Sequence, residues 1–404
     1  MILIEEAQKI ISSHTSLLSV ENVPIIHGLG RVIAEDVYAP WDIPLTDKSA
    51  MDGYAFSSQS PVPDIWVVAD FIPAGRLRTA PVVQGEAVKI MTGAPIPPGC
   101  DTVAPIEDVE QTPDGIRLMY DLKPGSHIRK RAEDVRINDL LTAAGAILRP
   151  QEIGLLVSLG KTSVKVYRKA RIAILATGDE LLDPGSSPAS GRIINSNSYS
   201  LAAQVLDAGG EPLLIGIAAD TAEATRKKIC EGLQADVLIT TGGVSVGDHD
   251  FVKESIQELG GNLLFWKVNM KPGKPIAFAM HEGKPLFALP GNPVAAMVGF
   301  ELFVRPSILK MMGHSRIIRP VVMAVLTNNI SNRGGRPHFV RVRIKLEKGV
   351  YTATANDNQS SANLMSLTLG NGLLKLEPNT SLPEGSTAEV TILDRGFEMG
   401  CIDT

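Results

Sequence analysis

The chain has 404 residues and a formal net charge of −5, from 39 Lys and Arg against 44 Asp and Glu. This length predicts two to four domains. Hydrophobic residues make up 44% of the chain and charged residues 21%, which argues against intrinsic disorder and predicts a sizeable core. The mildly acidic balance argues against a broad basic surface for nucleic acid or an anionic membrane, so any bound anion must be held by local groups.

The cysteines point to a reducing environment. Cys100, Cys230 and Cys401 lie far apart, and their odd number and the lack of a C-x-x-C pair argue against a disulfide framework or a structural zinc site. The N-terminal segment does not resemble a secretory signal, and no apolar run reaches the roughly 20 residues that cross a bilayer. We therefore expect a cytoplasmic protein that binds neither membrane nor nucleic acid.

The predicted elements of the first 168 residues are short. Apolar spacing predicts a helix over residues 4–11, and residues 31–37 resemble a strand. Between Pro40 and Arg136, strand-like runs at 65–69, 87–91 and 115–119 are broken by Pro and Gly, which predicts a small all-β domain. A helix over 151–158 and a strand over 164–167 follow.

Strands and helices alternate from residue 171, which predicts βαβ units and a mainly parallel sheet covered on both faces. We expect this α/β domain to end near residue 316. The predicted strands are 172–176, 213–217, 237–241, 264–268, 276–280 and 286–289, and the predicted helices are 198–207, 222–233, 251–259 and 294–311. Beyond residue 320, runs at 321–326, 339–346, 350–355, 373–376 and 388–393 predict a small β-barrel or sandwich.

Glycine-rich loops follow three predicted strands of the sheet, at residues 176–180, 240–250 and 289–293. In an open parallel sheet, ligands bind at the carboxyl ends of the strands, where backbone N–H groups and helix N-termini meet anions. Any one of these loops could be merely a turn. Three at equivalent ends of one sheet favour a phosphate-binding crevice, and none has the spacing of a P-loop.

Charged residues accompany these loops. Glu180, Asp248 and Asp250 are oxygen ligands suited to Mg²⁺, which proteins usually bind through one or two carboxylates and a substrate phosphate, although each could instead cap a helix. Lys271 and Lys274 flank a Pro-Gly pair, and this stiff segment could aim two cations at an oxyanion or form a solvated loop.

The predicted all-β domain contributes further polar segments. Asp52-Gly53 alone would predict a hairpin turn, and residues 91–99 form a rigid loop with a hydroxyl. Residues 128–135 carry a basic triplet and an acidic pair, which could clamp a phosphate or form salt bridges on the surface. No Ser/His/Asp or Cys/His arrangement is recognisable, so charge stabilisation around a metal and an anion is favoured over covalent catalysis.

Six motifs occur in one order along the chain. They are Ser49-Ala-Met-Asp-Gly-Tyr-Ala55, Met91-Thr-Gly-Ala-Pro95, Ala176-Thr-Gly-Asp-Glu-Leu181, Thr241-Gly-Gly-Val-Ser-Val-Gly-Asp248, Lys271-Pro-Gly-Lys-Pro275 and Leu289-Pro-Gly-Asn-Pro-Val294. Together they resemble the MoeA family of molybdopterin molybdenumtransferases, which is related to the gephyrin E domain. The resemblance extends from about residue 5 to the end, with Lys48 where Asn is common and Ala132 where Gly is common.

The resemblance implies an elongated homodimer whose subunit has four parts. Part I would comprise residues 1–42 and 137–168, part II the inserted β domain 43–136, part III the MogA-like α/β molybdopterin-binding domain 169–318, and part IV the C-terminal β domain 319–404. It also implies the reaction, a Mg²⁺-dependent insertion of molybdate into adenylylated molybdopterin with release of AMP. Molybdopterin adenylyltransferase and molybdoenzyme chaperones would be candidate partners.

The resemblance also assigns site residues by position. Glu180 and Asp250 would bind Mg²⁺ and, together with Asp52, Lys271 and Lys274, form the catalytic set. Residues expected to bind the molybdopterin ligand or molybdate are Thr92, Arg129, Asp134, Thr177, Gly178, Asp220, Gly242, Gly243, Ser245, Pro290, Gly291, Asn292, Pro293, Arg341 and Ser361. Because part II faces part III of the partner subunit in this family, each active site would need both chains.

Two other functions remain open. A molybdopterin adenylyltransferase shares the fold of part III, although parts II and IV would then be additional. A gephyrin-like scaffold is the alternative that is not an enzyme, although no appended linker or partner-binding tail is recognisable. Molybdate and tungstate, both tetrahedral dianions of similar size, are not distinguished by the sequence.

Overall fold

The computed structural model describes residues 1–59, 62–187, 189–243 and 251–393. The chain divides into two compact units: unit 1 comprises Met1–Ala34, Gly145–Leu148 and Ser163–Thr404, and unit 2 comprises Glu35–Ala144 and Arg149–Thr162. Within the described ranges, no helix combines the length and the hydrophobicity that a membrane span requires. The boundaries of the four parts expected from the sequence stay a prediction.

A six-stranded sheet with the order β16-β13-β17-β20-β19-β18 forms the centre of unit 1. The strands are β13 (Arg171–Thr177), β16 (Glu211–Ala218), β17 (Val237–Thr241), β18 (Asn262–Trp266), β19 (Ala277–His281) and β20 (Lys284–Leu289). The first four strands of this order are parallel, and β19 and β18 add two antiparallel pairs at one edge. The expected mainly parallel sheet is confirmed.

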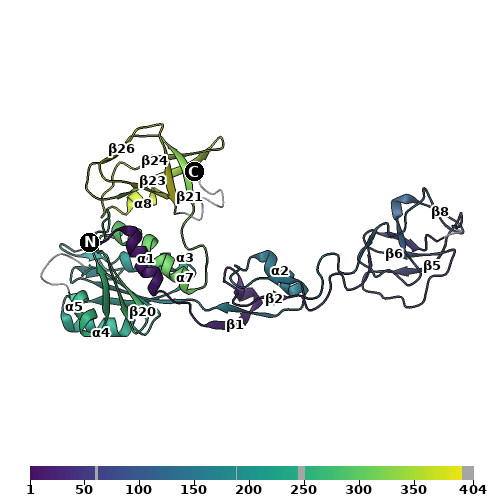
Figure 1. The fold of residues 1–404 in the computed structure, drawn as a ribbon, viewed down its shortest axis with the longest axis horizontal. Coiled ribbons are helices and arrows are strands. Elements are labelled where there is room, and N and C mark those ends of the chain that lie inside the picture. The colour runs from purple at the N-terminus through teal and green to yellow at the C-terminus, as the bar shows by residue number, and fades with distance from the viewer. Residues whose placement is uncertain (60–61, 188, 244–250, 394–404) are drawn as a thin grey trace. The chain divides into compact units, whose positions relative to one another are not determined.

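Helices cover both faces of this sheet, and alternate strand residues point to them. The helices are α1 (Ile4–His14), α3 (Asn197–Asp207), α4 (Ala222–Gly232), α5 (Phe251–Glu258), α6 (Pro293–Gly299) and α7 (Arg305–Met311). Ile172 and Ile174 of β13 pack with α1, α3, α6 and α7, whereas Ala173 and Leu175 pack with α4 and α5. Figure 1 shows α4 and α5 on one side of the sheet and α1, α3 and α7 on the other.

The helix predicted over 294–311 is confirmed, but its centre is a π-helix, η3 (Phe300–Val304), between α6 and α7. Pro306 has no backbone N–H to donate to the carbonyl of Leu302, four residues earlier. Gln8 of α1 donates its Nε2 to that oxygen at 3.1 Å instead. The irregular turn therefore coincides with the place where proline interrupts the helical hydrogen bonds.

The C-terminal strands of unit 1 form a closed barrel in the order β21-β24-β23-β25-β27. They are β21 (Val321–Leu326), β23 (His338–Glu347), β24 (Val350–Ala355), β25 (Gly372–Leu376) and β27 (Thr387–Ile392), with the pair β22 (Ile330–Asn332) and β26 (Thr380–Leu382) and helix α8 (Met365–Thr368) beside them. Val340 and Val342 of β23 belong to the barrel core, whereas Phe339, on the opposite face, joins the core of the α/β layer. Of the two predicted architectures, the barrel is correct.

Two strand pairs and a short 3₁₀ turn complete the described part of unit 1. Strand β1 (Val20–Pro24), followed by the 3₁₀ turn η1 (Ile25–Gly28), pairs antiparallel with β12 (Ser163–Tyr167), and β14 (Leu181–Leu182) pairs parallel with β15 (Ile193–Ile194). The predicted strand over residues 31–37 is wrong. Val32 bridges Ile147 while Ile33 bridges Val166, so successive residues pair with different segments and no continuous ladder forms.

Unit 2 is built mainly of short strands, as predicted, with a four-stranded sheet in the order β5-β6-β4-β7. Its elements are β2 (Val37–Tyr38), β3 (Lys48–Ser49), β4 (Gly53–Phe56), β5 (Val67–Ile72), β6 (Glu86–Ile90), β7 (Thr102–Pro105), η2 (Ile106–Asp108), β8 (Val109–Thr112), β9 (Gly115–Leu118), β10 (Ile128–Arg129), β11 (Leu140–Thr142) and α2 (Pro150–Ser158).

Gly53 begins β4 and is not part of a hairpin turn. A Cβ there would lie 1.9 Å from the carbonyl oxygen of Ala104 in β7, so close strand approach requires the glycine.

Candidate active site

A cleft of about 970 Å³ in unit 1 is formed by the loops at the carboxyl ends of the parallel strands. Barrel residues Ala362 and Leu364 also contribute to its wall. Of the site residues predicted from the sequence, the structure brings together here Thr177, Gly178, Glu180, Asp220, Gly242, Gly243, Pro290, Gly291, Asn292 and Pro293. The loops meet because strands β13, β17 and β20 are parallel neighbours.

The second loop approaches the end of β13 so closely that only glycine fits. Gly242 and Gly243 have φ values of 92° and 64°. A Cβ on Gly242 would lie 2.5 Å from the carbonyl oxygen of Thr177, and one on Gly243 would lie 2.8 Å from its Oγ1. That hydroxyl is buried and has no hydrogen-bond partner among the described residues. The two glycines therefore pack against Thr177, a residue of the cleft wall, without giving its hydroxyl a hydrogen-bond partner.

Replacing Gly242 by alanine should distort this loop and destabilise the protein. The strained φ and the clash with Thr177 together predict a loss of about 2–4 kcal/mol in the free energy of unfolding, measured by chemical denaturation. Gly291→Ala is the matched control, because its Cβ would meet nothing nearer than the Gly242 Cα at 3.6 Å. Equal stability of the two variants would contradict the steric requirement at Gly242.

Two loops that carry acidic residues are joined by hydrogen bonds at one end of the cleft. The Asp179 N–H donates to Asp220 Oδ2 at 3.2 Å, and the Asp220 N–H donates to Asp179 Oδ1 at 3.1 Å. Glu180, the next residue, lies over Gly178, whose Cβ would be 2.5 Å from Glu180 Oε2. Asp179 was not predicted as a site residue, although it stands inside the Thr-Gly-Asp-Glu motif.

Part of the predicted set cannot be placed. Ser245, Asp248 and Asp250 lie outside the described residues. Among the residues that are described, no group of three or more His, Cys, Asp or Glu side chains could hold a metal ion. The carboxylates that remain for a hard cation in the cleft are those of Glu180 and Asp220.

Asn197, at the start of α3, connects the second and third loops and was missed by the sequence reasoning. Its Nδ2 donates to Thr241 Oγ1 and to the carbonyl of Gly291, both at 2.8 Å. Thr241 Oγ1 in turn donates to the carbonyl of Pro290 at 3.1 Å. The Asn-Ser-Asn run before the predicted helix was the available signal for a polar side chain at this junction.

The lysine segment lies against the barrel. The Lys271 N–H donates to Pro337 O, and the Phe339 N–H donates to Lys271 O, both at 2.8 Å, so the backbone of Lys271 is fixed to the start of β23. Lys274 accepts a backbone hydrogen bond from Val268 at 3.0 Å. Both lysine side chains are exposed and form no ion pair among the described residues, so they are available to bind an anion.

Arg341 of β23 is a fully buried cation, with 0% of the residue exposed. Its Nε donates to Ser366 Oγ at 3.2 Å and its Nη2 to the carbonyl of Ser360 at 3.1 Å. It forms no ion pair within the described part of the chain, and burial lowers its pKa to about 10, so it stays charged at neutral pH. The neighbouring Ser361 carbonyl accepts from the Val294 N–H at 3.1 Å, so this loop reaches the start of α6 at the cleft.

His338 is a second buried polar group on β23 that sequence reasoning passed over. It is 6% exposed, and its Nε2 has no hydrogen-bond partner among the described residues. Burial, reinforced by the charges of Lys271 and Arg341, lowers the pKa of His338 to about 4. The ring is therefore neutral at neutral pH and adds no charge to that of the two cations.

In unit 2, Asp52 and Thr92 form one local contact. Asp52 Oδ1 accepts from the Thr92 hydroxyl at 2.6 Å and from its N–H at 2.7 Å. These two hydrogen bonds lower the pKa of Asp52, so the carboxylate is charged at neutral pH. The structure thus connects the first two motifs of the chain through one side chain.

The basic segment of unit 2 forms salt bridges, which was one of its two predicted fates. Arg129 pairs with Asp134, Lys130 with Asp47, and Arg131 with Asp42. Ala132, within this segment, has a φ of 61°. The left-handed conformation explains why glycine is common at this position in the family that the chain resembles.

Comparisons with known proteins cover nearly the whole chain. Family models match residues 2–160 (MoeA N-terminal region, domains I and II), 173–310 (probable molybdopterin binding domain) and 323–393 (MoeA C-terminal region, domain IV). Molybdopterin molybdenumtransferase 2 of Mycobacterium tuberculosis is 35% identical over 92% of this chain and 95% of its own length. The molybdopterin molybdenumtransferase of Haemophilus influenzae is 38% identical over 77% and 78%.

Solved structures agree with the sequence matches. Two crystal structures of the molybdopterin biosynthesis MoeA protein from Pyrococcus horikoshii match with TM-scores of 0.85 and 0.81. They are 30% and 29% identical in sequence, over 98% and 97% of this chain and 99% and 100% of theirs. The fold, the order of the domains and the sequence motifs thus agree, and the chain belongs to the MoeA family of molybdopterin molybdenumtransferases.

Proposed function

We propose that this protein inserts molybdenum from molybdate into adenylylated molybdopterin and releases AMP. The observation that carries the proposal is the composition of the site. Three loops and two acidic side chains line one cleft, and the loop that reaches it from the barrel covers a buried arginine, which has no acidic partner among the described residues. Such a site suits a phosphate-bearing ligand and a separate oxyanion. The name shared by relatives aligned along most of the chain supports the same reaction.

The α/β loops are the proposed binding site for the adenylylated ligand. Backbone N–H groups of the loops and the positive ends of helices such as α3 stabilise phosphate charge. Asn197 fixes the spacing of the second and third loops, so these groups are positioned before the ligand binds.

Mg²⁺ is the proposed cofactor, and the oxygen donors in the cleft fit its preference for carboxylate ligands. Glu180 and Asp250 are the metal ligands proposed from the sequence, and Asp220, which lines the same cleft as Glu180, would be a further ligand. When bound, the ion would offset the negative charge that develops on the departing AMP. The two hydrogen bonds between Asp179 and Asp220 fix the loop that carries Asp220 to the loop that carries Glu180.

The barrel side is the proposed molybdate site. Arg341, Ser361, Lys271 and Lys274 would supply the cationic and hydroxyl groups, because charge-assisted hydrogen bonds are the strongest contacts available to an oxyanion. Arg341 is held by Ser366 and Ser360 and is fully buried, so the loop around Ser360 and Ser361 would shift for its guanidinium to contact the anion. Tungstate would fit the same groups.

A direct assay separates the candidate reactions. Purified protein incubated with adenylylated molybdopterin, Mg²⁺ and molybdate should release AMP in step with cofactor formation, and should not release it when molybdate is omitted. Incubation with ATP and molybdopterin should give no adenylylated product. Adenylylation without molybdate consumption would identify an adenylyltransferase instead, and inactivity in both assays would favour a scaffold. Competition by tungstate would measure the metal preference.

We further propose a homodimer in which unit 2 of one subunit supplies Asp52, Thr92, Arg129 and Asp134 to the cleft of the other. Asp52→Ala and Lys274→Ala subunits, each inactive alone, should then complement each other. A verified heterodimer keeps one intact site of two, so about half of the wild-type activity per dimer is expected. No recovery in isolated heterodimers would contradict a shared site.

The remaining proposals concern the cellular setting. Cys100 and Cys230 are both free thiols, in agreement with the reducing cytoplasm that we propose. A molybdopterin adenylyltransferase would supply the substrate, and molybdoenzyme chaperones would receive the product. Neither nucleic acid nor a membrane is a proposed partner.

A further inference from the structure

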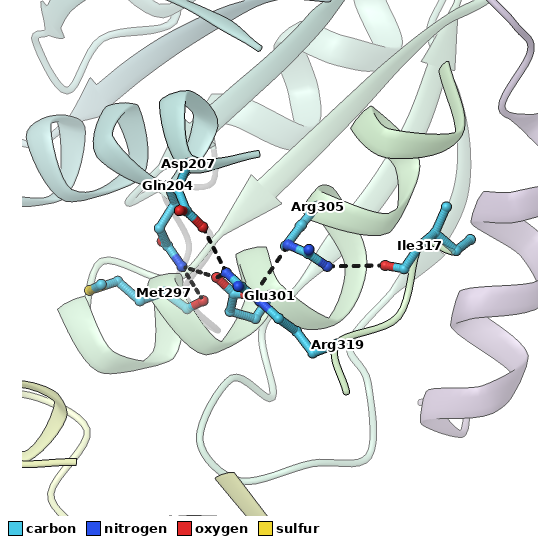
Figure 2. A network of polar contacts seen from close by, with 7 residues as sticks. All are labelled: Gln204, Asp207, Met297, Glu301, Arg305, Ile317 and Arg319. Atoms are coloured by element: carbon cyan, nitrogen blue, oxygen red, sulfur yellow. Dashed lines mark hydrogen bonds and ion pairs between the residues drawn. The ribbon is translucent and has the colours of Figure 1, made fainter. Parts of the chain in front are cut away.

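A buried ion-pair cluster connects the barrel to two helices of the α/β layer (Figure 2). Arg319 stands in the connection between α7 and β21. Its Nε donates to Glu301 Oε2 of η3 at 2.9 Å, and its Nη2 donates to Asp207 Oδ2 at the end of α3, also at 2.9 Å. The side chains of Arg319 and Glu301 are only 10% and 9% exposed, so this contact is largely shielded from water.

Further hydrogen bonds fix Glu301 and the connection. Gln204 Nε2 donates to Glu301 Oε1 at 2.9 Å, and Arg305 Nη1 donates to the carbonyl of Ile317 at 3.1 Å. Burial alone would lower the pKa of Arg319, but the hydrogen bonds and charges of Glu301 and Asp207 outweigh it and raise that pKa. Arg319 is therefore charged at neutral pH.

The cluster touches neither the cleft nor the proposed ligands. Helix α3 runs from Asn197, at the cleft, to Asp207, and the second helical segment runs from Pro293, at the cleft, to Glu301. At a rise of 1.5 Å per residue, the cluster lies about 12–15 Å along these helices from the site. Arg319 thus contacts the end of α3 and the middle of the helix formed by α6, η3 and α7, and the N-terminal ends of both helices border the proposed substrate.

The barrel returns to the same helices at the cleft. It begins at Val321, two residues beyond Arg319, and its Ser361 accepts the backbone hydrogen bond of Val294. Between the two attachments, α3, α6 and the barrel border a cavity of about 560 Å³, whose wall includes Met297, Leu367 and Leu373. Phe339 and Leu373 of the barrel pack into the core of the α/β layer, and the polar attachments at Arg319 and Ser361 hold the barrel at the two ends of this cavity.

We propose that Arg319 is a positioning residue for the metal-inserting reaction, because it fixes the start of the barrel to the end of α3 and to η3 and so sets where the barrel residues Arg341 and Ser361 lie relative to the cleft. This inference rests on the proposed function of the site. Arg319 does not contact the substrate. Its effect should therefore appear in the use of molybdate, which depends on barrel residues, and not in the binding of adenylylated molybdopterin, which depends on the α/β loops.

The test replaces Arg319 by methionine in the full-length protein and measures both substrates separately. A displacement of about 1 Å at a reacting group costs up to 10²-fold, so we expect the kcat/KM for molybdate to fall by about 10- to 100-fold. The KM for adenylylated molybdopterin should stay within about 2-fold of the wild-type value, which corresponds to a change in binding free energy below about 1 kcal/mol. Arg319→Lys, which keeps the charge, should recover part of the loss.

Two further variants separate position from stability. Arg168→Met is the matched control, because Arg168 forms a bidentate, partly shielded ion pair with Asp236 (side chains 30% and 15% exposed) elsewhere in unit 1. It should lower the thermal midpoint without changing the kcat/KM for molybdate. Should Arg319→Met fail to fold, the triple variant Arg319→Met, Glu301→Gln, Asp207→Asn also removes the two acidic charges that Arg319 contacts and should show the same loss with molybdate.

The outcomes distinguish this inference from the proposed function. A lower thermal midpoint with wild-type kcat/KM for molybdate in Arg319→Met would make Arg319 merely structural and overturn the inference. Lack of molybdate-dependent AMP release by the wild type would instead reject the proposed function. In that case, amide hydrogen exchange still tests how firmly the barrel is held. Residues 356–371 should exchange faster in Arg319→Met than in the wild type or in Arg168→Met. Equal exchange in the three proteins would overturn the inference.

Discussion

Glu180→Ala should abolish molybdate-dependent AMP release and leave the protein folded. The residue is exposed, and among the described residues its carboxylate forms no ion pair, so its removal should change the free energy of unfolding by less than about 0.5 kcal/mol. Its carboxylate is one of those that we propose for Mg²⁺. Without it, the charge on the departing AMP is poorly offset, and kcat should fall on the order of 10²- to 10³-fold.

The measurement is AMP release and cofactor formation at saturating Mg²⁺, with thermal unfolding as the check on folding. Asp183→Ala is the control, because Asp183 is an exposed acid three residues further along the same segment that does not line the cleft. Wild-type activity in Glu180→Ala would remove this residue from the metal site. An equal loss in Asp183→Ala would show that the general negative charge of the segment matters more than one ligand.

Arg341→Met should weaken the use of molybdate and leave the protein at least as stable as the wild type. Burial lowers the pKa of Arg341 below its ordinary value, so keeping this group charged inside the protein costs stability at every pH below about 10. Methionine removes that cost together with the hydrogen bonds to Ser366 and Ser360. A hydrogen bond from a charged group contributes about 1.5–3 kcal/mol, which predicts a rise of about 10- to 100-fold in the KM for molybdate.

Thermal unfolding with and without molybdate gives a second readout. Molybdate at 100 times its Kd should stabilise the wild type by about 2.7 kcal/mol and stabilise Arg341→Met much less. Arg343→Met, two residues further along β23, is the control and should keep the wild-type response. A lower thermal midpoint of Arg341→Met without molybdate, or an unchanged response to molybdate, would contradict the assignment of Arg341 as the buried anion-binding cation.

The cleft loops were predictable because the sequence signals were local and repeated. Each loop follows a buried strand, and parallel strands bring equivalent ends together, so Thr177, Gly242 and Gly291 had to approach one another. The barrel was predictable as an architecture from its spaced strand-like runs. The motifs also identified the family, which composition and periodicity alone would not have done.

The residues that were missed act through tertiary contacts. Asn197 joins two loops through hydrogen bonds to Thr241 and Gly291, more than 40 residues away in the sequence. His338 becomes notable only because β23 buries it beside Lys271. Neither property has a signature in a short window of sequence.

The misassigned strand and the misread glycine have a related cause. Residues 31–37 have strand-like composition, but Val32 and Ile33 pair with two different segments. Asp52-Gly53 matches a turn dipeptide, but the approach of Ala104 in β7 decides the role of Gly53. In both cases the pairing partner, which local sequence does not specify, determines the structure.

The π-helical turn at Phe300–Val304 accommodates one residue more than an α-helical turn would. Deleting one residue within this turn should therefore leave a regular α-helix in which α6 and α7 still face the same way. A deletion in a regular α-helical stretch, at 3.6 residues per turn, would instead rotate everything after it by about 100°. Ile308 and Met311 of α7, both buried in the unit 1 core, would then turn away from it. The loss of a single residue should therefore be tolerated more readily inside this turn than anywhere else in the helix.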